Sequence, residues 1–271
     1  MIPRRSFLTG SVAGFSSIPF LTPNKGIEKV IKKSTIHQPN PNSPAFYVEE
    51  INEFNNTRNI CYYKDINQAK VSISAFEYHR EDGPAVINFE NDKCVYEAWY
   101  KDGKLHRIGG PARTMEIHHN CIKQEWLVDG VYHREDGPSM ILEDNDNQEF
   151  HYSYNFHGKL HNTNGPAYIY DSPRHYREEW SINGLSHRTD GPAKTYYEKN
   201  SSLKEEDWYV NGLLHRTDGP ASIFVNQTGF KNNIYYYKGH RLNYDLAKNI
   251  QEGKPLTQNQ IDLIERRINV S

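Results

Sequence analysis

A seven-residue motif recurs along this 271-residue chain at a nearly constant spacing. Each copy begins with His and carries Gly-Pro at its fifth and sixth positions, and successive histidines are separated by 27, 27, 28, 26 and 28 residues. The copies occupy residues 79–85, 106–112, 133–139, 161–167, 187–193 and 215–221. Self-similarity at a fixed period is typical of stacked structural repeats. We therefore expect an array of about six copies of one small unit.

Each unit has the pattern of two β-strands joined by a tight turn. The first strand ends at a pair such as Asn211-Gly212 or Asp102-Gly103, which favours a two-residue hairpin turn. A second strand follows the motif's proline, where the missing N–H does least harm. The glycine before this proline is expected to permit backbone angles that other residues resist. The predicted fold class is all-β: an elongated array of about six antiparallel β-hairpin repeats with a small C-terminal helical cap.

The candidate site residues are those of the motif, and a structural role is expected for them. Arg and Asp two positions apart occur together in four copies and are both replaced by Asn in the fourth copy, which indicates a local pair that shapes the loop. An exposed pair of this kind contributes only ~0–1 kcal/mol. The motif residues are His79, Arg80, Asp82, His106, Arg107, His133, Arg134, Asp136, His161, His187, Arg188, Asp190, His215, Arg216 and Asp218.

An aromatic residue lies seven positions before the histidine in most units. This aromatic column consists of Trp99, Trp126, Tyr154, Trp180, Trp208 and Tyr235, the last of which belongs to a half-unit after the sixth motif. One interpretation is a buried stripe that supplies the hydrophobic face of the array. The alternative is an exposed ladder on which a glycan or a peptide could lie.

The unit Trp-x-x-x-Gly-x-x-His-Arg-x-Asp-Gly-Pro-Ala resembles the variant MORN-type repeats of bacteria, phages and large DNA viruses. The resemblance covers residues 71 to about 242. It implies successive β-hairpins in one elongated, twisted sheet, and a role in protein or membrane association. The unit here is longer than the usual MORN repeat, and its Gly-Pro-Ala portion belongs to the variant form.

The regions outside the array have different patterns. Residues 1–22 resemble a twin-arginine export signal through Arg4, Arg5, Phe7 and Leu8, whereas an accidental Arg pair would leave the protein in the cytoplasm. Residues 23–45 have the composition of a polar linker. Residues 46–70 are expected to form an N-terminal cap of the array at 71–242, with Ser72 and Phe76 replacing Trp and Gly in the first unit.

The segment 243–271 is predicted to form a helical cap that covers the last edge strand. Thr257 and Gln260 have the spacing of a capping box. Ile261, Leu263, Ile264 and Ile268 offer an apolar stripe.

Composition excludes several classes of partner. The net charge of −2 argues against nucleic acid, and no apolar stretch is long enough for a membrane span. Three cysteines, Cys61, Cys94 and Cys121, are too few for a disulfide framework and are expected to be free thiols.

No metal or other cofactor is predicted. The repeat histidines should recur roughly 9–10 Å apart, too far to share one metal ion, and His118 and His119 should point to opposite faces of a strand. Because the polar residues are periodic, no catalytic residue and no enzyme activity are expected. The sequence favours a non-enzymatic scaffold that binds a protein, with a carbohydrate-binding surface as the alternative; partner identity and oligomeric state remain open.

Overall fold

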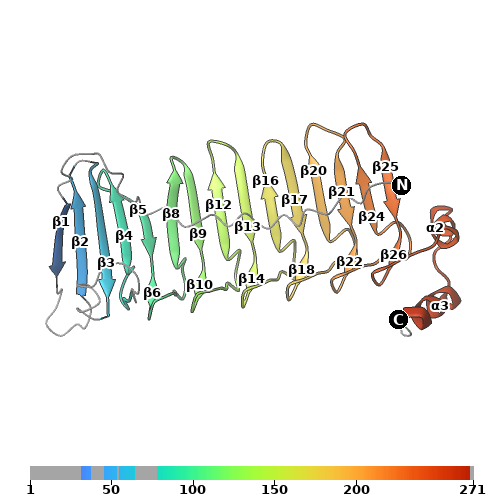
Figure 1. The fold of residues 1–271 in the computed structure, drawn as a ribbon, viewed down its shortest axis with the longest axis horizontal. Helices are drawn as coiled ribbons and strands as arrows, with labels where there is room; N and C mark the ends of the chain where they lie inside the picture. Colours follow the sequence, from blue (N-terminus) through green and yellow to red (C-terminus); the bar gives the residue numbers. More distant parts are fainter. Residues whose placement is uncertain (1–31, 38–45, 54, 65–77, 269–271) are drawn as a thin grey trace, which may run out of the picture.

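The protein forms one long antiparallel sheet with a row of small hairpins along one edge (Figure 1). The computed structural model describes residues 32–37, 46–53, 55–64 and 78–268. Within these residues the sheet has 15 strands. Each pairs with the sheet strands that precede and follow it in the chain, with the short hairpin strands left out of the count, so the topology is a simple meander. The strands are β1 (Lys32–His37), β2 (Phe46–Asn52), β3 (Thr57–Tyr63), β4 (Val86–Glu90), β5 (Lys93–Ala98), β8 (Arg113–His118), β9 (Cys121–Glu125), β12 (Met140–Asp144), β13 (Glu149–Ser153), β16 (Tyr168–Asp171), β17 (His175–Glu179), β20 (Lys194–Glu198), β21 (Lys204–Asp207), β24 (Ser222–Val225) and β25 (Lys231–Ile234).

Two-stranded hairpins continue from alternate strands of this sheet and lie along its lower edge in Figure 1. They pair β6 (Tyr100–Lys101) with β7 (Lys104–Leu105), β10 (Leu127–Val128) with β11 (Val131–Tyr132), β14 (Asn155–Phe156) with β15 (Lys159–Leu160), β18 (Ser181–Ile182) with β19 (Leu185–Ser186), β22 (Tyr209–Val210) with β23 (Leu213–Leu214), and β26 (Tyr236–Tyr237) with β27 (His240–Arg241). Both turn residues have positive φ, as at Asn211 (50°) and Gly212 (78°). The turns predicted from the Asn-Gly and Asp-Gly pairs are therefore confirmed.

The aromatic column residue marks the boundary between the long sheet and each hairpin. In the unit of Trp208, β21 ends just before this residue and β22 begins just after it. The Trp208 N–H donates to the Ala221 carbonyl at 2.7 Å, and its own carbonyl accepts from the His215 N–H at 2.9 Å. The expected first strand is thus divided in two, because the chain changes pairing partner at the aromatic residue.

The interior of this single-layer array is thin and lined with small side chains. The residue after Gly-Pro is fully buried in every motif copy, and it is Ala except at Ser139. At this position the chain runs between two neighbouring strands, as where Ala85 donates to Ala98 and accepts from Tyr62, both at 2.7 Å. A larger side chain has no room there, which explains how so few large apolar residues suffice.

Two helices, α2 (Tyr244–Gln251) and α3 (Gln258–Ile268), pack against the end of the array (Figure 1). Their buried cluster contains Tyr235, Tyr237, Leu242, Ile250 and Leu256. The helices therefore cover the last small hairpin rather than strand β25, which differs from the expectation that they cover the edge strand. The reason is that the apolar side chains of the last unit, Tyr235 and Tyr237, lie on the hairpin side.

Details of the helical cap can be compared with the sequence. The capping box is present: Thr257 N–H donates to Gln260 Oε1 at 2.8 Å, and Gln260 N–H donates to Thr257 Oγ1 at 3.4 Å. Ile261 and Ile264 pack on the cluster, whereas Leu263 is exposed, so its inclusion in the apolar stripe was wrong. No helix in the described part of the chain is long and apolar enough to cross a membrane.

The N-terminal region contributes strands to the same sheet. Residues 32–37, which were expected to lie in a polar linker, form β1 and pair with β2. Strand β3 pairs with β4 and joins this region to the array. The export-like residues Arg4, Arg5, Phe7 and Leu8, and the first-unit residues Ser72 and Phe76, lie outside the described residues.

Candidate functional site

The motif arginine organises the loop in five of the six motif copies. Its Nε donates to the Asp two residues later at 2.7–2.8 Å in Arg80–Asp82, Arg134–Asp136, Arg188–Asp190 and Arg216–Asp218, so the predicted pairs are present. One Nη donates to the motif proline's carbonyl at 3.1–3.5 Å in all five arginine-bearing loops, including that of Arg107, which has no Asp partner. These bonds close the loop on itself.

The aspartates of these pairs are exposed, and the arginine lowers their pKa values. In Asp82, Asp136, Asp190 and Asp218 the first cause is the hydrogen bond from Arg. The charge attraction of the same Arg also lowers these pKa values. The carboxylates are therefore ionised at neutral pH and are occupied with shaping the loop.

The guanidinium group also covers the aromatic column. The Arg Cζ atom lies 3.9–4.2 Å from the ring centre of the tryptophan eight residues earlier, a cation–π geometry. These pairs are Arg107–Trp99, Arg134–Trp126, Arg188–Trp180 and Arg216–Trp208. In the first loop Arg80 lies over Tyr62 at 4.1 Å, so Tyr62 takes the aromatic place there, a residue that the periodic spacing did not predict.

The column is neither a fully buried stripe nor an open ladder. Its members are half-buried, except Tyr235, which is buried against the helices. The arginines occupy one ring face of each tryptophan. A sugar stacking on these rings would have to use the remaining surface or displace the guanidinium group.

Glycine is required before the motif proline for a different reason from the one expected. Gly83, Gly110, Gly137, Gly191 and Gly219 do not have positive φ. Instead, a Cβ atom at these positions would lie 2.5–2.9 Å from the motif arginine's guanidinium carbon. Glycine is required because the guanidinium group lies between the glycine backbone and the aromatic ring.

The motif histidine links one unit to the next. Its Nδ1 accepts the N–H of the first turn residue of the following hairpin at 3.1–3.3 Å. These donor–acceptor pairs are Asp102–His79, Asp129–His106, His157–His133, Asn183–His161, Asn211–His187 and Lys238–His215. At His106 and His187, Nδ1 also lies 2.9 and 3.0 Å from the side-chain oxygen of the same turn residue, so its role there depends on the tautomer. At His215 no such oxygen is present, an acceptor Nδ1 carries no proton, and burial and Lys238 lower the pKa of His215.

The fourth loop builds the same shape without charge. Asn162 Nδ2 donates to the Pro166 carbonyl at 2.9 Å, as the arginines do, and Asn162 Oδ1 accepts the Asn164 N–H at 3.0 Å. A Cβ atom on Gly165 would lie 3.5 Å from Asn162 Nδ2, which is ordinary van der Waals contact.

A buried acid before the column residue was missed by the sequence reasoning. Glu125, just before Trp126, is fully buried and accepts hydrogen bonds from Arg113 and Tyr132, with Lys123 Nζ at 2.8 Å. Burial raises the pKa of Glu125, but these donors outweigh it and hold the pKa below its usual range. Glu179 takes the same place before Trp180 and accepts from Ser186 at 2.9 Å. The available signal was an acidic residue directly before the column residue in three units, Glu125, Glu179 and Asp207.

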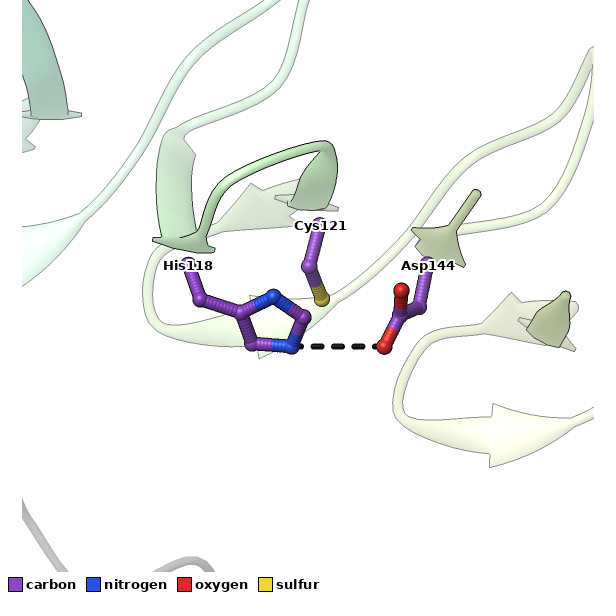
Figure 2. Close-up of side chains that lie close together, drawn as sticks. All are labelled: His118, Cys121 and Asp144. Carbon is purple, nitrogen blue, oxygen red and sulfur yellow. Dashed lines mark ion pairs between the residues drawn. The ribbon is translucent and has the colours of Figure 1, made fainter. Parts of the chain in front are cut away.

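One group of side chains has metal-ligand chemistry in the described part of the chain. His118, Cys121 and Asp144 each place a nitrogen, sulfur or oxygen atom within 4.8 Å of the others (Figure 2). The repeat histidines are not part of it. All three cysteines are free, as predicted, but Cys121 is buried whereas Cys94, one repeat earlier, is exposed.

Comparison with known proteins gives no further identification. No protein-family model matches the chain, and no curated protein matches it in sequence.

Proposed function

We propose that this protein is a non-enzymatic scaffold built from variant MORN-type repeats, and that it binds a protein along its row of small hairpins. Support comes first from the motif residues, whose polar groups are engaged within the fold. The arginines bind Asp and Pro in their own loops, and the histidines bind the next turn. Such residues maintain a rigid, evenly spaced support rather than a reaction centre.

The observation that carries the proposal is a set of exposed aliphatic side chains at the same position of three hairpins, where the other three hairpins have Lys104, Lys159 and His240. Val131, Leu185 and Leu213 follow the turn glycine of their hairpins and are 45%, 51% and 49% exposed. We call them the hairpin-edge row. Gly158, Gly212 and Gly239 of the following turns lie beside these side chains. Aliphatic groups fixed on one edge, with basic side chains at the equivalent positions between and beside them, suit a protein surface with matching apolar contacts.

The carbohydrate-binding alternative has less support. Glycan stacking needs free aromatic faces, and arginine guanidinium groups lie 3.9–4.2 Å from the tryptophan ring centres. Glycan-array binding that is lost on Trp126→Ala and Trp180→Ala, with the sheet intact by circular dichroism, would favour this alternative over the scaffold.

The test is capture by the tagged full-length chain in its own cells after cross-linking, followed by reconstitution with the purified partner. The triple variant Val131→Glu, Leu185→Glu, Leu213→Glu should lose this partner. The matched control Ile108→Glu, Leu263→Glu changes exposed apolar residues outside the row and should keep it. A partner that binds the triple variant as tightly as the wild type would contradict the proposal, and turnover on a substrate panel would contradict its non-enzymatic part.

The compartment of this partner depends on residues 1–22. An Arg4→Lys, Arg5→Lys variant that stays unprocessed in the cytosol, beside a periplasmic wild type, would support export. Cytosolic wild type with Met1 intact, in a host whose export machinery is working, would direct the search to intracellular proteins.

A further inference from the structure

A thiol, an imidazole and a carboxylate meet at the ends of three neighbouring strands that lie opposite the row of small hairpins. In register, His118 of β8 lies opposite Cys121 of β9, and Cys121 lies opposite Asp144 of β12. Residues directly opposite on antiparallel strands share one face, with Cβ atoms roughly 4.5–5.5 Å apart. Figure 2 shows the three side chains converging from their strands, with His118 Nε2 and Asp144 Oδ2 3.2 Å apart.

A β-bulge creates this arrangement. The register of β8 and β9 shifts between Glu116 and His118, so that Ile117 is the extra residue. Without the bulge Ile117 would lie opposite Cys121, and His118 would pass into the turn. Ile117 is instead exposed, which is unfavourable for an isoleucine. A bulge commonly re-aims a side chain at a functional position, and here it directs His118 toward Cys121 and Asp144.

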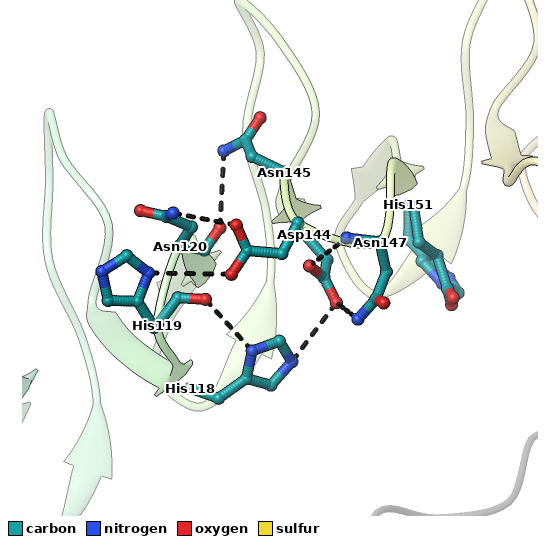
Figure 3. A network of polar contacts seen from close by, with 9 residues as sticks. His118, His119, Asn120, Asp144, Asn145, Asn147 and His151 are labelled. Carbon is teal, nitrogen blue, oxygen red and sulfur yellow. Dashed lines mark hydrogen bonds and ion pairs between the residues drawn. The ribbon is translucent and has the colours of Figure 1, made fainter.

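Neighbouring groups orient two of the three side chains (Figure 3). Asn147 donates to both carboxylate oxygens of Asp144, from its backbone N–H at 3.0 Å and from Nδ2 at 2.7 Å. His118 Nδ1 lies 3.2 Å from the His119 carbonyl. This contact requires a proton on Nδ1, and in the neutral ring the lone pair of Nε2 then faces Asp144. A backbone carbonyl orients metal-binding histidines in the same way.

The contact between His118 and Asp144 leaves a place for a proton or a metal ion. A neutral Nε2 and a carboxylate oxygen, both lone-pair donors, face each other at 3.2 Å and repel unless a proton or a metal ion lies between them. Cys121 is only 3% exposed. Its sulfur lies within 4.8 Å of the nearest donor atoms of His118 and Asp144. A bound divalent cation would allow the thiolate to form and would balance the two negative ligands.

We propose that His118 Nε2, Cys121 Sγ and Asp144 bind one zinc ion, with a water molecule as the fourth ligand on the exposed side of His118. Sulfur, imidazole nitrogen and carboxylate oxygen together suit zinc, whereas calcium and magnesium take oxygen ligands. Zinc bonds of ~2.0–2.3 Å place tetrahedral ligands roughly 3.5 Å apart. The present separations, from 3.2 Å between His118 Nε2 and Asp144 Oδ2 up to at most 4.8 Å in the group, lie on both sides of this value. The ion would staple β8, β9 and β12, a role that goes beyond the proposed scaffold function.

The chain supplies a matched control for this site. Cys94 lies 27 residues before Cys121, in the equivalent strand β5, but it lies opposite Phe89 and is exposed. Cys94 belongs to no group of metal-ligand side chains among the described residues, so Cys94→Ser should leave zinc binding unchanged. His119→Gln, next to His118 but paired with Asp146 at 3.6 Å, should also leave it unchanged.

The experiment is calorimetric titration of reduced, metal-free, full-length protein with zinc at neutral pH, repeated in buffers of different ionisation enthalpy. One zinc ion should bind per chain and release the thiol proton of Cys121. Cobalt should give visible bands of a tetrahedral site and a thiolate-to-cobalt charge-transfer band. Cys121→Ser should abolish the charge-transfer band, and His118→Gln, a change at an exposed residue, should abolish stoichiometric binding with circular dichroism unchanged.

Asn147→Ala tests the orientation of the carboxylate and should weaken zinc binding ~10–100-fold. The proposal is overturned if the wild type binds no zinc in a one-to-one ratio. It is also overturned if Cys121→Ser and His118→Gln bind zinc like the wild type, since the ion would then occupy other surface histidines. Partner capture by the hairpin-edge row is unaffected by either outcome, so the two proposals fail separately.

Discussion

Two adjacent loops of the array, residues 161–167 and 187–193, build the same backbone with opposite side-chain chemistry. In each, the column residue's N–H donates to the motif alanine at 2.7 Å, and the motif histidine's N–H returns to the column carbonyl at 2.9–3.0 Å. The later loop adds Arg188 over Trp180 and paired with Asp190. The earlier loop uses Asn162 and Asn164 without any charge. Backbone pairing therefore fixes the loop, and the side chains are exchangeable as a set.

The difference extends to the residue before the column. Ser153 precedes Tyr154 and accepts from Asn155 Nδ2 at 2.9 Å, whereas Glu179 precedes Trp180 and lies 3.2 Å from Lys194 Nζ. In the fourth unit the residue before the column and the two motif positions are uncharged, whereas the third and fifth units have charged side chains at these positions. Four changes should test how far the two chemistries are equivalent.

The largest effect is expected at the buried acid of the third unit. Glu125→Ala should lower the free energy of unfolding by ~3–5 kcal/mol, because it leaves Arg113 and Lys123 together with no counter-charge. Ser153→Ala, at the equivalent neutral position, should cost only ~1 kcal/mol. Urea unfolding followed by tryptophan fluorescence measures both, and equal losses would contradict the distinction.

A methyl group at the motif glycine should separate the two loops directly. Gly191→Ala places Cβ 2.8 Å from the Arg188 guanidinium carbon and should cost ~1–2 kcal/mol as the stack on Trp180 and the pair with Asp190 are lost. Gly165→Ala has room beside Asn162 and should be neutral within ~0.5 kcal/mol. The thermal midpoints of the two variants measure this difference. A greater loss at Gly165 would contradict the explanation that glycine is needed because the guanidinium group lies between its backbone and the aromatic ring.

Acid should weaken the charged loops and leave the neutral loop unchanged. The hydrogen bond and charge of Arg188 hold the pKa of Asp190 below its usual range. A lowered folded-state pKa contributes stability above the unfolded value of ~3.9, and this is lost as pH falls through the folded pKa. The Arg188 Nε–H signal in NMR should shift with Asp190 titration, whereas the Asn162 side-chain amide should not follow it. A co-titrating Asn162 signal would show that the loops are coupled.

The smallest effect is expected when the neutral loop receives the Arg and Asp pair of the charged loops. Asn162→Arg with Asn164→Asp should give a folded protein within ~1 kcal/mol of the wild type, since exposed pairs contribute little. The single changes and the double change form a thermodynamic cycle, and their coupling energy should fall with added salt. A large loss in the double variant would mean that Tyr154 cannot serve as the arginine's platform.

Sequence periodicity predicted the recurring parts of the fold well, because they depend on local chemistry. Asn211-Gly212 specifies its turn through positive φ, and Arg and Asp two residues apart reach each other within one loop. The role of the motif glycine was misassigned, since the guanidinium position over Trp180 depends on how the loop folds back on the strand. The same holds for Tyr62, which lies outside the periodic spacing.

The cluster of His118, Cys121 and Asp144 could not have been predicted from spacing alone. It depends on strand register and on a bulge at Ile117, and one residue of slip would turn His118 away from Cys121. His119 was expected on the same strand as His118, but β8 ends at His118 and His119 lies in the turn. An imidazole three residues before a cysteine was the only local signal.

The single-layer meander has a mechanical consequence. The strands lie across the long axis of the molecule, and each bonds only to the strand before and after it (Figure 1). Tension along that axis would separate one pair of strands at a time. The hydrogen bonds within a pair would then break in sequence and not all together. The array would then lengthen in steps at low force and yield at its weakest joint first. A zinc ion bound by residues of β8, β9 and β12 would hold these three strands together and interrupt their stepwise separation.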